Sequence, residues 1–181
     1  MRRIMHRLFM AWQYEKEEDW LNEMAANGWN LVDTSLFRYT FEEGTPGEYQ
    51  YRLELLEHGA KSPESIAYIR FMEETGAEHI ATWFNGWTYF RKKVSDGPFA
   101  IFSDIDSKIK HLKRIERILL LALACELCAG GAQGVQYADT GGAWSLGVFI
   151  FAMVLAVIIL LGLVRIRKQI KHWKEERDIR E

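Results

Sequence analysis

Residues 143–164 read AWSLGVFIFAMVLAVIILLGLV, a stretch of 22 residues without a charged side chain. An α-helix rises about 1.5 Å per residue, so about 20 apolar residues are enough to cross the hydrocarbon core of a bilayer, which is about 30 Å thick. The alternative is a helix buried inside a soluble domain, but a run this long and this apolar is rare in a domain of this size. The stretch therefore predicts a transmembrane helix.

A second apolar run, residues 118–137, precedes it and reads ILLLALACELCAGGAQGVQY. This run is weaker because it contains Glu126, Gln133 and three glycines. A carboxyl group near the membrane centre costs about 3 kcal/mol on insertion scales, roughly what six Leu or Ile residues return at about −0.5 kcal/mol each. Only residues 138–142 separate the two runs, so we expect the stronger helix to bring the weaker one into the membrane as a hairpin.

Lys and Arg side chains gather at the two outer ends of this hairpin, whereas the loop GVQYADTGG between the helices has neither. Positively charged flanks stay in the cytoplasm, so we expect a two-pass protein of the cytoplasmic membrane, in contact with the lipid bilayer and with both termini in the cytoplasm. Residues 94–117 are expected to form a linker and a juxtamembrane helix, and residues 165–181 a basic tail helix. The flanking basic residues are Lys108, Lys110, Lys113, Arg114, Arg117, Arg165, Arg167, Lys168, Lys171, Lys174 and Arg177.

The region before the hairpin, residues 1–93, shows one pattern twice. The first copy predicts a strand at 8–12, a helix at 15–28 and strands at 29–35 and 36–42; the second predicts a strand at 49–56, a helix at 63–76 and strands at 78–84 and 87–92. A shift of 48 residues superposes Met24 on Met72 and Gly28 on Gly76. We therefore expect an α+β fold: a duplicated β-α-β-β cytoplasmic domain, with a mostly antiparallel sheet and both helices on one face, followed by the two-helix transmembrane hairpin.

The charge distribution and the two cysteines argue against nucleic-acid binding, redox chemistry and zinc binding. Residues 1–107 carry 11 Lys and Arg against 18 Asp and Glu, whereas residues 108–181 carry 12 against 7. An acidic domain repels a phosphate backbone, so nucleic acid is not an expected partner. Cys125 and Cys128 form a C-x-x-C motif inside an apolar run, where a thiol ionises poorly, so redox and zinc chemistry are disfavoured.

Motifs of catalysis are missing from the sequence. It contains no G-x-S-x-G, no H-E-x-x-H and no glycine-rich phosphate loop, and its five histidines are scattered. We therefore expect no catalytic residues, no metal and no cofactor, and a protein that is not an enzyme.

The last predicted hairpin is apolar on both faces, and its aromatic residues are candidates for binding. Strand alternation places Phe84, Trp87 and Tyr89 on one side and Trp83 on the other, around an Asn85-Gly86 dipeptide that is typical of a type I′ turn. One side can pack under the helices, and the other needs a partner: a small apolar ligand, a second copy of the chain or another protein. The alternative is an ordinary core rich in aromatic residues.

The weaker apolar run carries a second set of candidates. Ala122, Glu126, Ala129 and Gln133 recur at helical spacing, and Gly130 and Gly134 add a GxxxG motif. This pattern predicts a face for helix packing, in which Glu126 is neutral and hydrogen-bonded. Transport chemistry is the alternative, but it would usually need a second ionisable group at a similar depth, and residues 143–164 offer none.

Three stretches resemble a known family. They are EKEEDWLNEMAANGWNL, YTFEEGTPGEYQYRLEL, and the series Y-x-x-F/M-E-E-T-G, W-x-Y-F-R-K and F-x-x-F-S-D, and together they are similar to the domain of unknown function 2812 across roughly residues 5–110. The resemblance implies a bacterial protein with C-terminal membrane helices, of a kind often encoded beside a PadR-like repressor. It brings no catalytic residues with it, and it implies a role in sensing membrane stress or regulating a membrane process.

Two functions follow as hypotheses. The first is a non-enzymatic, membrane-anchored cytoplasmic sensor or regulatory module that binds a protein partner, another copy of itself or an apolar ligand. The second is an accessory subunit of a transporter or envelope-stress complex that docks through its transmembrane hairpin.

Overall fold

The computed structural model describes residues 1–35, 37–83 and 85–180. The chain divides into two compact units, Met1–Asp104 and Ile105–Glu181. The first unit contains the strands, and the second contains two long helices.

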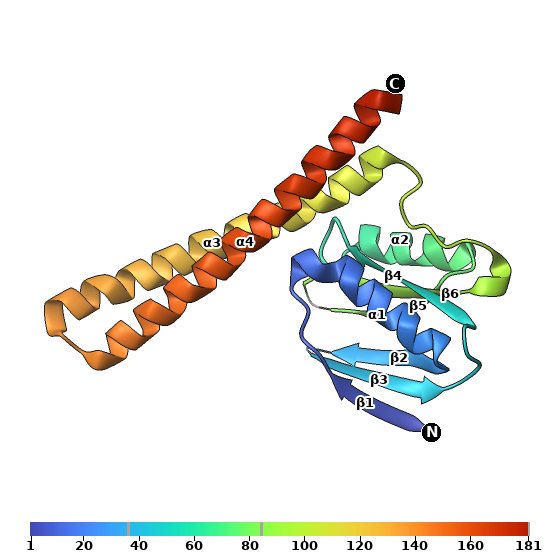
Figure 1. Ribbon diagram of the computed structural model, residues 1–181, viewed down its shortest axis with the longest axis horizontal. Coiled ribbons are helices and arrows are strands. Elements are labelled where there is room, and N and C mark those ends of the chain that lie inside the picture. The colour runs from blue at the N-terminus through green and yellow to red at the C-terminus, as the bar shows by residue number, and fades with distance from the viewer. Residues whose placement is uncertain (36, 84, 181) are drawn as a thin grey trace. The chain divides into compact units, whose positions relative to one another are not determined.

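The first unit is built from two copies of one β-α-β-β arrangement (Figure 1). The first copy comprises β1 (Arg2–His6), the short 3-10 helix η1 (Ala11–Gln13), α1 (Tyr14–Ala26), β2 (Trp29–Ser35) and β3 (Arg38–Glu43). The second comprises β4 (Tyr49–Leu55), α2 (Pro63–Glu74), β5 (Glu78–Thr82) and β6 (Trp87–Lys93), and is followed by the 3-10 helix η2 (Val94–Asp96). The orders β1-β3-β2 and β4-β6-β5 are the same, and every pairing is antiparallel. The expected α+β class is confirmed.

The strands form two three-stranded sheets rather than the single sheet that we expected. In each copy the last strand lies between the other two, so the outer strands are both sheet edges. Backbone groups at these edges need partners that the sheet itself does not supply.

The first strand does not lie where the sequence pattern placed it. The expected strand at 8–12 is wrong, because β1 pairs with β3 from Arg2↔Glu42 to His6↔Arg38. β1 is exposed along most of its length, so it lacks the apolar alternation of a half-buried strand. The apolar residues that follow it serve packing instead: the ring of Phe9 lies 5.6 Å from that of Trp20 on α1.

Local signals explain where the helices begin and end. Ser62 caps α2 by accepting a hydrogen bond from the Ser65 amide at 3.1 Å, and Pro63 occupies the first turn, where its missing N–H is not needed. Gly28 and Gly76 follow the two helices with φ of +79° and +88°, which an L side chain rarely adopts. These glycines occupy equivalent positions in the two copies, as the 48-residue shift predicted.

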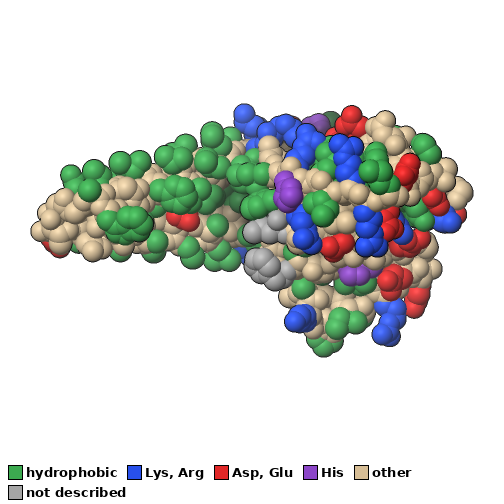
Figure 2. All heavy atoms as spheres, turned by 90° about the horizontal axis from the view of Figure 1, so that it is seen from below, with side chains coloured by type: hydrophobic (Ala, Val, Ile, Leu, Met, Phe, Trp, Pro, Cys, Tyr) green, Lys and Arg blue, Asp and Glu red, His purple; other side chains and the backbone are tan. Residues whose placement is uncertain are grey.

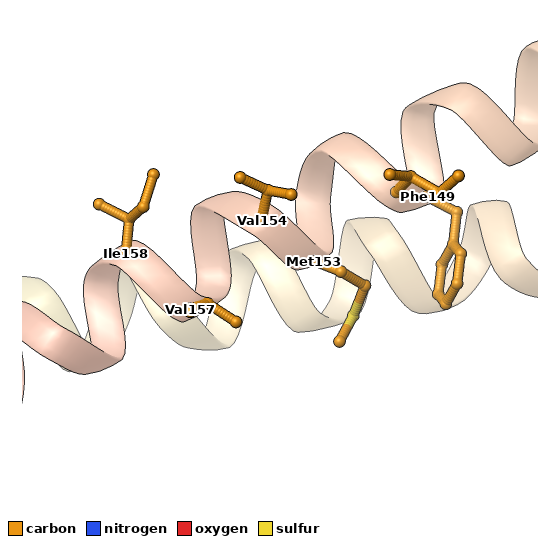
Figure 3. Close-up of a pocket in the computed structure, with 6 residues that line it drawn as sticks. Phe149, Met153, Val154, Val157 and Ile158 are labelled. Carbon is orange, nitrogen blue, oxygen red and sulfur yellow. The ribbon is translucent and has the colours of Figure 1, made fainter.

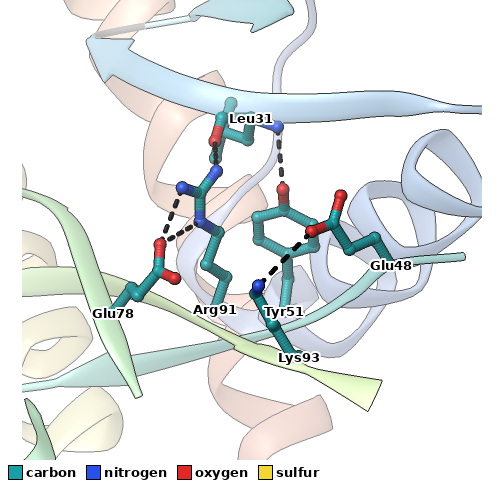
Figure 4. Close-up of polar contacts among 6 residues, drawn as sticks. All are labelled: Leu31, Glu48, Tyr51, Glu78, Arg91 and Lys93. Atoms are coloured by element: carbon teal, nitrogen blue, oxygen red, sulfur yellow. Dashed lines mark hydrogen bonds and ion pairs between the residues drawn. The ribbon is translucent and has the colours of Figure 1, made fainter. Parts of the chain in front are cut away.

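Side chains of the second copy satisfy the backbone of β2 (Figure 4). The Leu31 amide donates to the hydroxyl of Tyr51 at 2.8 Å, and the Leu31 carbonyl accepts from the guanidinium of Arg91 at 3.3 Å. Glu78 holds that guanidinium with contacts of 2.7 Å. The two copies are thus joined by polar contacts between the backbone of β2 and side chains of β4 and β6.

Helix α1 completes the outer edge of β4 in a similar way. The side-chain amide of Asn22 accepts from the Tyr51 amide at 2.7 Å and donates to the Tyr51 carbonyl at 3.3 Å. The Leu53 amide donates to the carboxylate of Glu18 at 2.7 Å. A helix of the first copy therefore pairs with a strand of the second, which ties the duplicated parts into one domain.

The second unit is a pair of antiparallel helices, α3 (Ile105–Thr140) and α4 (Ala143–Arg180) (Figure 1). Arg167 pairs with Glu116 at 2.6 Å, Arg177 pairs with Asp106 at 3.1 Å, and the ammonium of Lys108 lies 4.1 Å from the ring centre of Trp173. The expected juxtamembrane helix and first span form one continuous helix.

Both helices are long and apolar enough to cross a membrane. Their most apolar windows are only 11% and 22% buried, unlike the core helices of a soluble protein, which are mostly buried. Figure 2 shows hydrophobic side chains along one face of this pair. A shallow hollow of about 340 Å³ on α4 is lined only by apolar side chains (Figure 3): Phe149, Ile150, Met153, Val154, Val157 and Ile158.

Candidate functional site

A cavity of about 330 Å³ lies between the two copies of the β-α-β-β domain. The first copy contributes the segment after β1, the buried side of α1 and the β2–β3 turn, and the second contributes the β5–β6 hairpin. The lining residues are Leu8, Phe9, Met10, Ala11, Tyr14, Glu17, Phe37, Trp83, Asn85, Trp87 and Tyr89.

Three of the four aromatic residues predicted as a binding site line this cavity. Trp83, Trp87 and Tyr89 come together on it, while Phe84 lies outside the described residues. Strand alternation across a two-residue turn had placed Trp83 on the opposite side, but the Trp83 amide bonds to the Trp87 carbonyl, so these two residues are opposite each other and share a side. The ring of Trp83 consequently lies 5.6 Å from that of Tyr89.

The connection between β5 and β6 also differs from the expected type I′ turn. The Trp83 amide donates to the Trp87 carbonyl at 2.8 Å, so the paired residues enclose more than Asn85 and Gly86. Gly86 has a φ of +91°, as expected of a glycine that ends a longer hairpin loop. The longer loop holds Asn85 at the cavity.

Glu17 is the only carboxylate among the described lining residues, and it was not predicted from the sequence. Its side chain is 6% exposed, and its Oε1 accepts hydrogen bonds from the hydroxyls of Tyr39 and Tyr89, each at 2.7 Å. Tyr39 belongs to the first copy and Tyr89 to the second, so this carboxylate bridges the two. A signal was present: Glu17 lies one turn before Trp20 and Leu21, on the apolar face of the helix predicted at 15–28.

Burial dominates the electrostatics of this group. It raises the pKa of Glu17, while the two tyrosine hydroxyls lower it by stabilising the charged form. Burial likewise raises the pKa of Tyr39 and of Tyr89, and the nearby Glu17 charge raises both further, so both hydroxyls stay protonated donors. Among the described residues no Lys or Arg forms an ion pair with Glu17.

The chain matches a family model across much of this site. The model, described as a protein of unknown function (DUF2812), covers residues 13–124. The chain belongs to the DUF2812 family. The match includes Glu17 and the aromatic residues of the β5–β6 hairpin. No curated protein and no solved structure matches the chain.

The mouth of the cavity in this DUF2812 protein contains a strained residue. Phe37 has a φ of +60°, which is uncommon for a residue other than glycine and costs about 1–2 kcal/mol. Its ring is 43% exposed, so burial of the ring does not explain the conformation. The Arg7 amide holds the turn by donating to the Phe37 carbonyl at 3.0 Å. A residue in this uncommon conformation thus lines the cavity.

Trp83 contributes an unusual polar group. Its indole Nε1 is buried and makes no hydrogen bond with the part of the chain that the structure describes. Buried N–H groups without an acceptor are uncommon in folded proteins. A bound molecule is one source of an acceptor.

The residues predicted as a helix-packing face on α3 differ in their exposure. Ala122, Glu126 and Gln133 are half-buried in the pair of helices, and Ala129 is exposed. The close packing is made by the glycines: a Cβ on Gly130 would come 3.0 Å from the Cβ of Ala152, and one on Gly134 would come 3.2 Å from the ring of Phe149. The DUF2812 match ends before Glu126.

Metal binding has no support in the described part of this DUF2812 protein. No group of three or more His, Cys, Asp or Glu side chains could hold an ion there. The cavity has aromatic walls, a buried carboxylate and few other polar groups. Such an arrangement is suited to binding a ligand.

Proposed function

We propose that this protein is a non-enzymatic, membrane-anchored regulatory module, and that the cavity between its two β-α-β-β copies is where it recognises its ligand or partner. The observation that carries the proposal is the cavity itself, with Trp83, Trp87 and Glu17 on its walls. Pockets for small molecules are mostly apolar, with a few placed polar groups, and they often lie between repeated or paired domains.

The membrane anchor is the second part of the proposal. Helices α3 and α4 cross the membrane as two passes, and residues 1–104 lie in the cytoplasm. The distribution of charge supports this orientation, because Lys and Arg flank the outer ends of the pair and the α3–α4 connection has neither. A ligand that partitions between membrane and cytoplasm would meet such a domain at the membrane surface.

Binding can be tested on the full-length chain in lipid nanodiscs. We expect small aromatic ligands to change the fluorescence of the seven tryptophans and to raise the melting temperature. Ala11→Phe fills the cavity from its wall and should abolish both changes. Ala26→Leu, at an exposed position near the end of α1, is the matched control and should leave them intact. A flat response of the wild-type chain to a broad panel contradicts the proposal.

An accessory subunit that docks through its helices remains the second candidate. The half-buried Glu126 and Gln133 favour it, because polar groups in apolar helices mark contacts between helices. Replacing residues 118–164 by an unrelated two-helix hairpin separates the two functions. Partners that still co-purify support recognition through the cytoplasmic domain, and partners that are lost support docking through the helices.

A further inference from the structure

We propose that the ligand of this cavity is an organic cation, an aromatic or alkyl ammonium, and that Glu17 supplies its counter-charge. The inference rests on the proposed function and adds the chemical class of the ligand. The observations that carry it are the carboxylate on the cavity wall, the absence of a cationic partner for it among the described residues, and the aromatic rings around it.

Glu17 has one oxygen committed and one free to interact. Oε1 accepts from Tyr39 and Tyr89, and Oε2 makes no hydrogen bond with any residue in the described ranges. A carboxylate removed from water is costly unless a positive charge or several donors compensate it. Two tyrosine hydroxyls compensate part of that cost. A cation in the cavity would compensate the rest.

The bridging hydrogen bonds do not by themselves require a charge. A glutamine at position 17 would offer the same kind of acceptor to the two tyrosines without the cost of burying a carboxylate. Holding the two copies together therefore does not explain why the residue on this wall is ionisable. Recognition of a positively charged ligand does.

The walls of the cavity suit a cation in the same way. The faces of tryptophan and tyrosine rings attract ammonium groups, and more strongly where water is excluded. Trp83, Trp87, Tyr14 and Tyr89 supply four such rings. The guanidinium of Arg7 lies 5.2 Å and 5.0 Å from the ring centres of Phe9 and Trp20, and of these two rings only that of Phe9 lines the cavity. Arg7 itself is not among the residues that line the cavity.

The net negative charge of the surrounding domain also favours a cationic ligand. Residues 1–107 carry seven more acidic than basic side chains. A negative field raises the local concentration of cations and lowers that of anions. An anionic ligand would meet both this field and the buried carboxylate.

Three small probes of similar shape and different charge test the inference. Phenyltrimethylammonium is a cation, tert-butylbenzene is its neutral counterpart, and benzenesulfonate is an anion. Each is titrated by calorimetry into the full-length chain in nanodiscs, with empty nanodiscs as the blank. We expect the cation to bind at least about tenfold more tightly than the neutral probe, as a desolvated cation–π and charge contact implies, and the anion not to bind.

Two variants assign the effect to the carboxylate. Glu17→Gln keeps an acceptor for Tyr39 and Tyr89. It should weaken binding of the cationic probe by about tenfold, and change the affinity for the neutral probe by less than about threefold. Glu23→Gln removes one charge from an exposed position of the same helix, outside the cavity lining, and should preserve the preference for the cation.

The outcomes separate this inference from the proposed function. If the cation and the neutral probe bind equally, the cavity binds ligands but the inference is wrong. If no probe binds and other aromatic ligands do not bind either, the inference and the proposed function are both contradicted. The comparison of probes on the wild-type chain decides the question even if Glu17→Gln does not fold.

Discussion

Two neighbouring carboxyl groups on α1 have different roles. Glu17 faces the cavity and is bridged by Tyr39 and Tyr89, whereas Glu18 accepts a hydrogen bond from the Leu53 amide at the edge of β4. Burial raises the pKa of both, and for Glu18 it raises the pKa to about 7. One helix turn thus places one carboxyl group at the cavity and another in a contact that joins the two copies.

The raised pKa of Glu18 makes the stability of the domain depend on pH. The folded domain holds the proton of Glu18 up to about pH 7, whereas an unfolded carboxyl loses it near 4.5, so the contribution of Glu18 is greatest below 4.5 and is lost as the pH rises through 7. We expect Glu18→Gln to flatten the fall in melting temperature between pH 5 and about 8. Glu23→Gln, an exposed control on the same helix, should keep the wild-type slope. An unchanged slope in Glu18→Gln would contradict the assignment.

Phe37 allows a test of backbone strain at the cavity mouth. Asn tolerates its φ of +60° better than Ala does, and neither replaces the ring. We therefore expect Phe37→Asn to be more stable than Phe37→Ala by about 0.5–1 kcal/mol in denaturant unfolding. Both variants should bind aromatic probes more weakly than the wild type. Equal stabilities would show that the left-handed conformation carries no strain.

Polar contacts between the two copies join them into one domain, and the cavity lies between the copies. The edge of β2 is satisfied by Tyr51 and Arg91 of the second copy, and the edge of β4 by Asn22 and Glu18 of α1. Each copy therefore completes the other.

Tyr51→Phe tests this junction. It leaves the buried amide of Leu31 without its acceptor, which costs about 1–3 kcal/mol of unfolding free energy. Tyr49→Phe is the matched control on the same strand, because the hydroxyl of Tyr49 makes no hydrogen bond within the described residues. Chemical denaturation of the full-length chain in detergent should show the loss for Tyr51→Phe alone. Equal stabilities of the two variants would mean that water replaces the lost acceptor.

Periodicity predicted the segments with one buried face well and the mostly exposed segments poorly. Strands β2 and β4 lie almost where the pattern placed them, since their apolar residues alternate into a core. β1 was missed because it is exposed at the sheet edge, and its apolar neighbours serve packing around Trp20. The separation into two sheets was not predictable, because it depends on side chains that satisfy backbone groups across the two copies.

Only part of the candidate site could be predicted from the sequence, because the rest depends on contacts between distant segments. The aromatic residues of the β5–β6 hairpin stand out in sequence because both faces of that hairpin are apolar. Glu17 comes from a helix about 70 residues earlier, and its bonds with Tyr39 and Tyr89 exist only once the two copies are packed. Contacts between distant segments carry no local pattern.

The proposed orientation places the domain and the cavity in the cytoplasm, and it can be tested on the complete chain in intact cells. With Cys125 and Cys128 replaced by alanine, a single cysteine is introduced by Asn27→Cys or by Asp139→Cys. The first position follows α1 in the domain, and the second lies near the α3–α4 connection.

A membrane-impermeant maleimide should label position 139 in intact cells and position 27 only after the cells are opened, because the basic flanks hold both outer helix ends in the cytoplasm. The cysteine-free parent is the control and should remain unlabelled. Labelling of position 27 from outside would invert the orientation, and it would place the carboxylate-containing cavity among extracellular rather than cytoplasmic cations. Protection of both positions in intact cells would contradict a two-pass arrangement with an external connection.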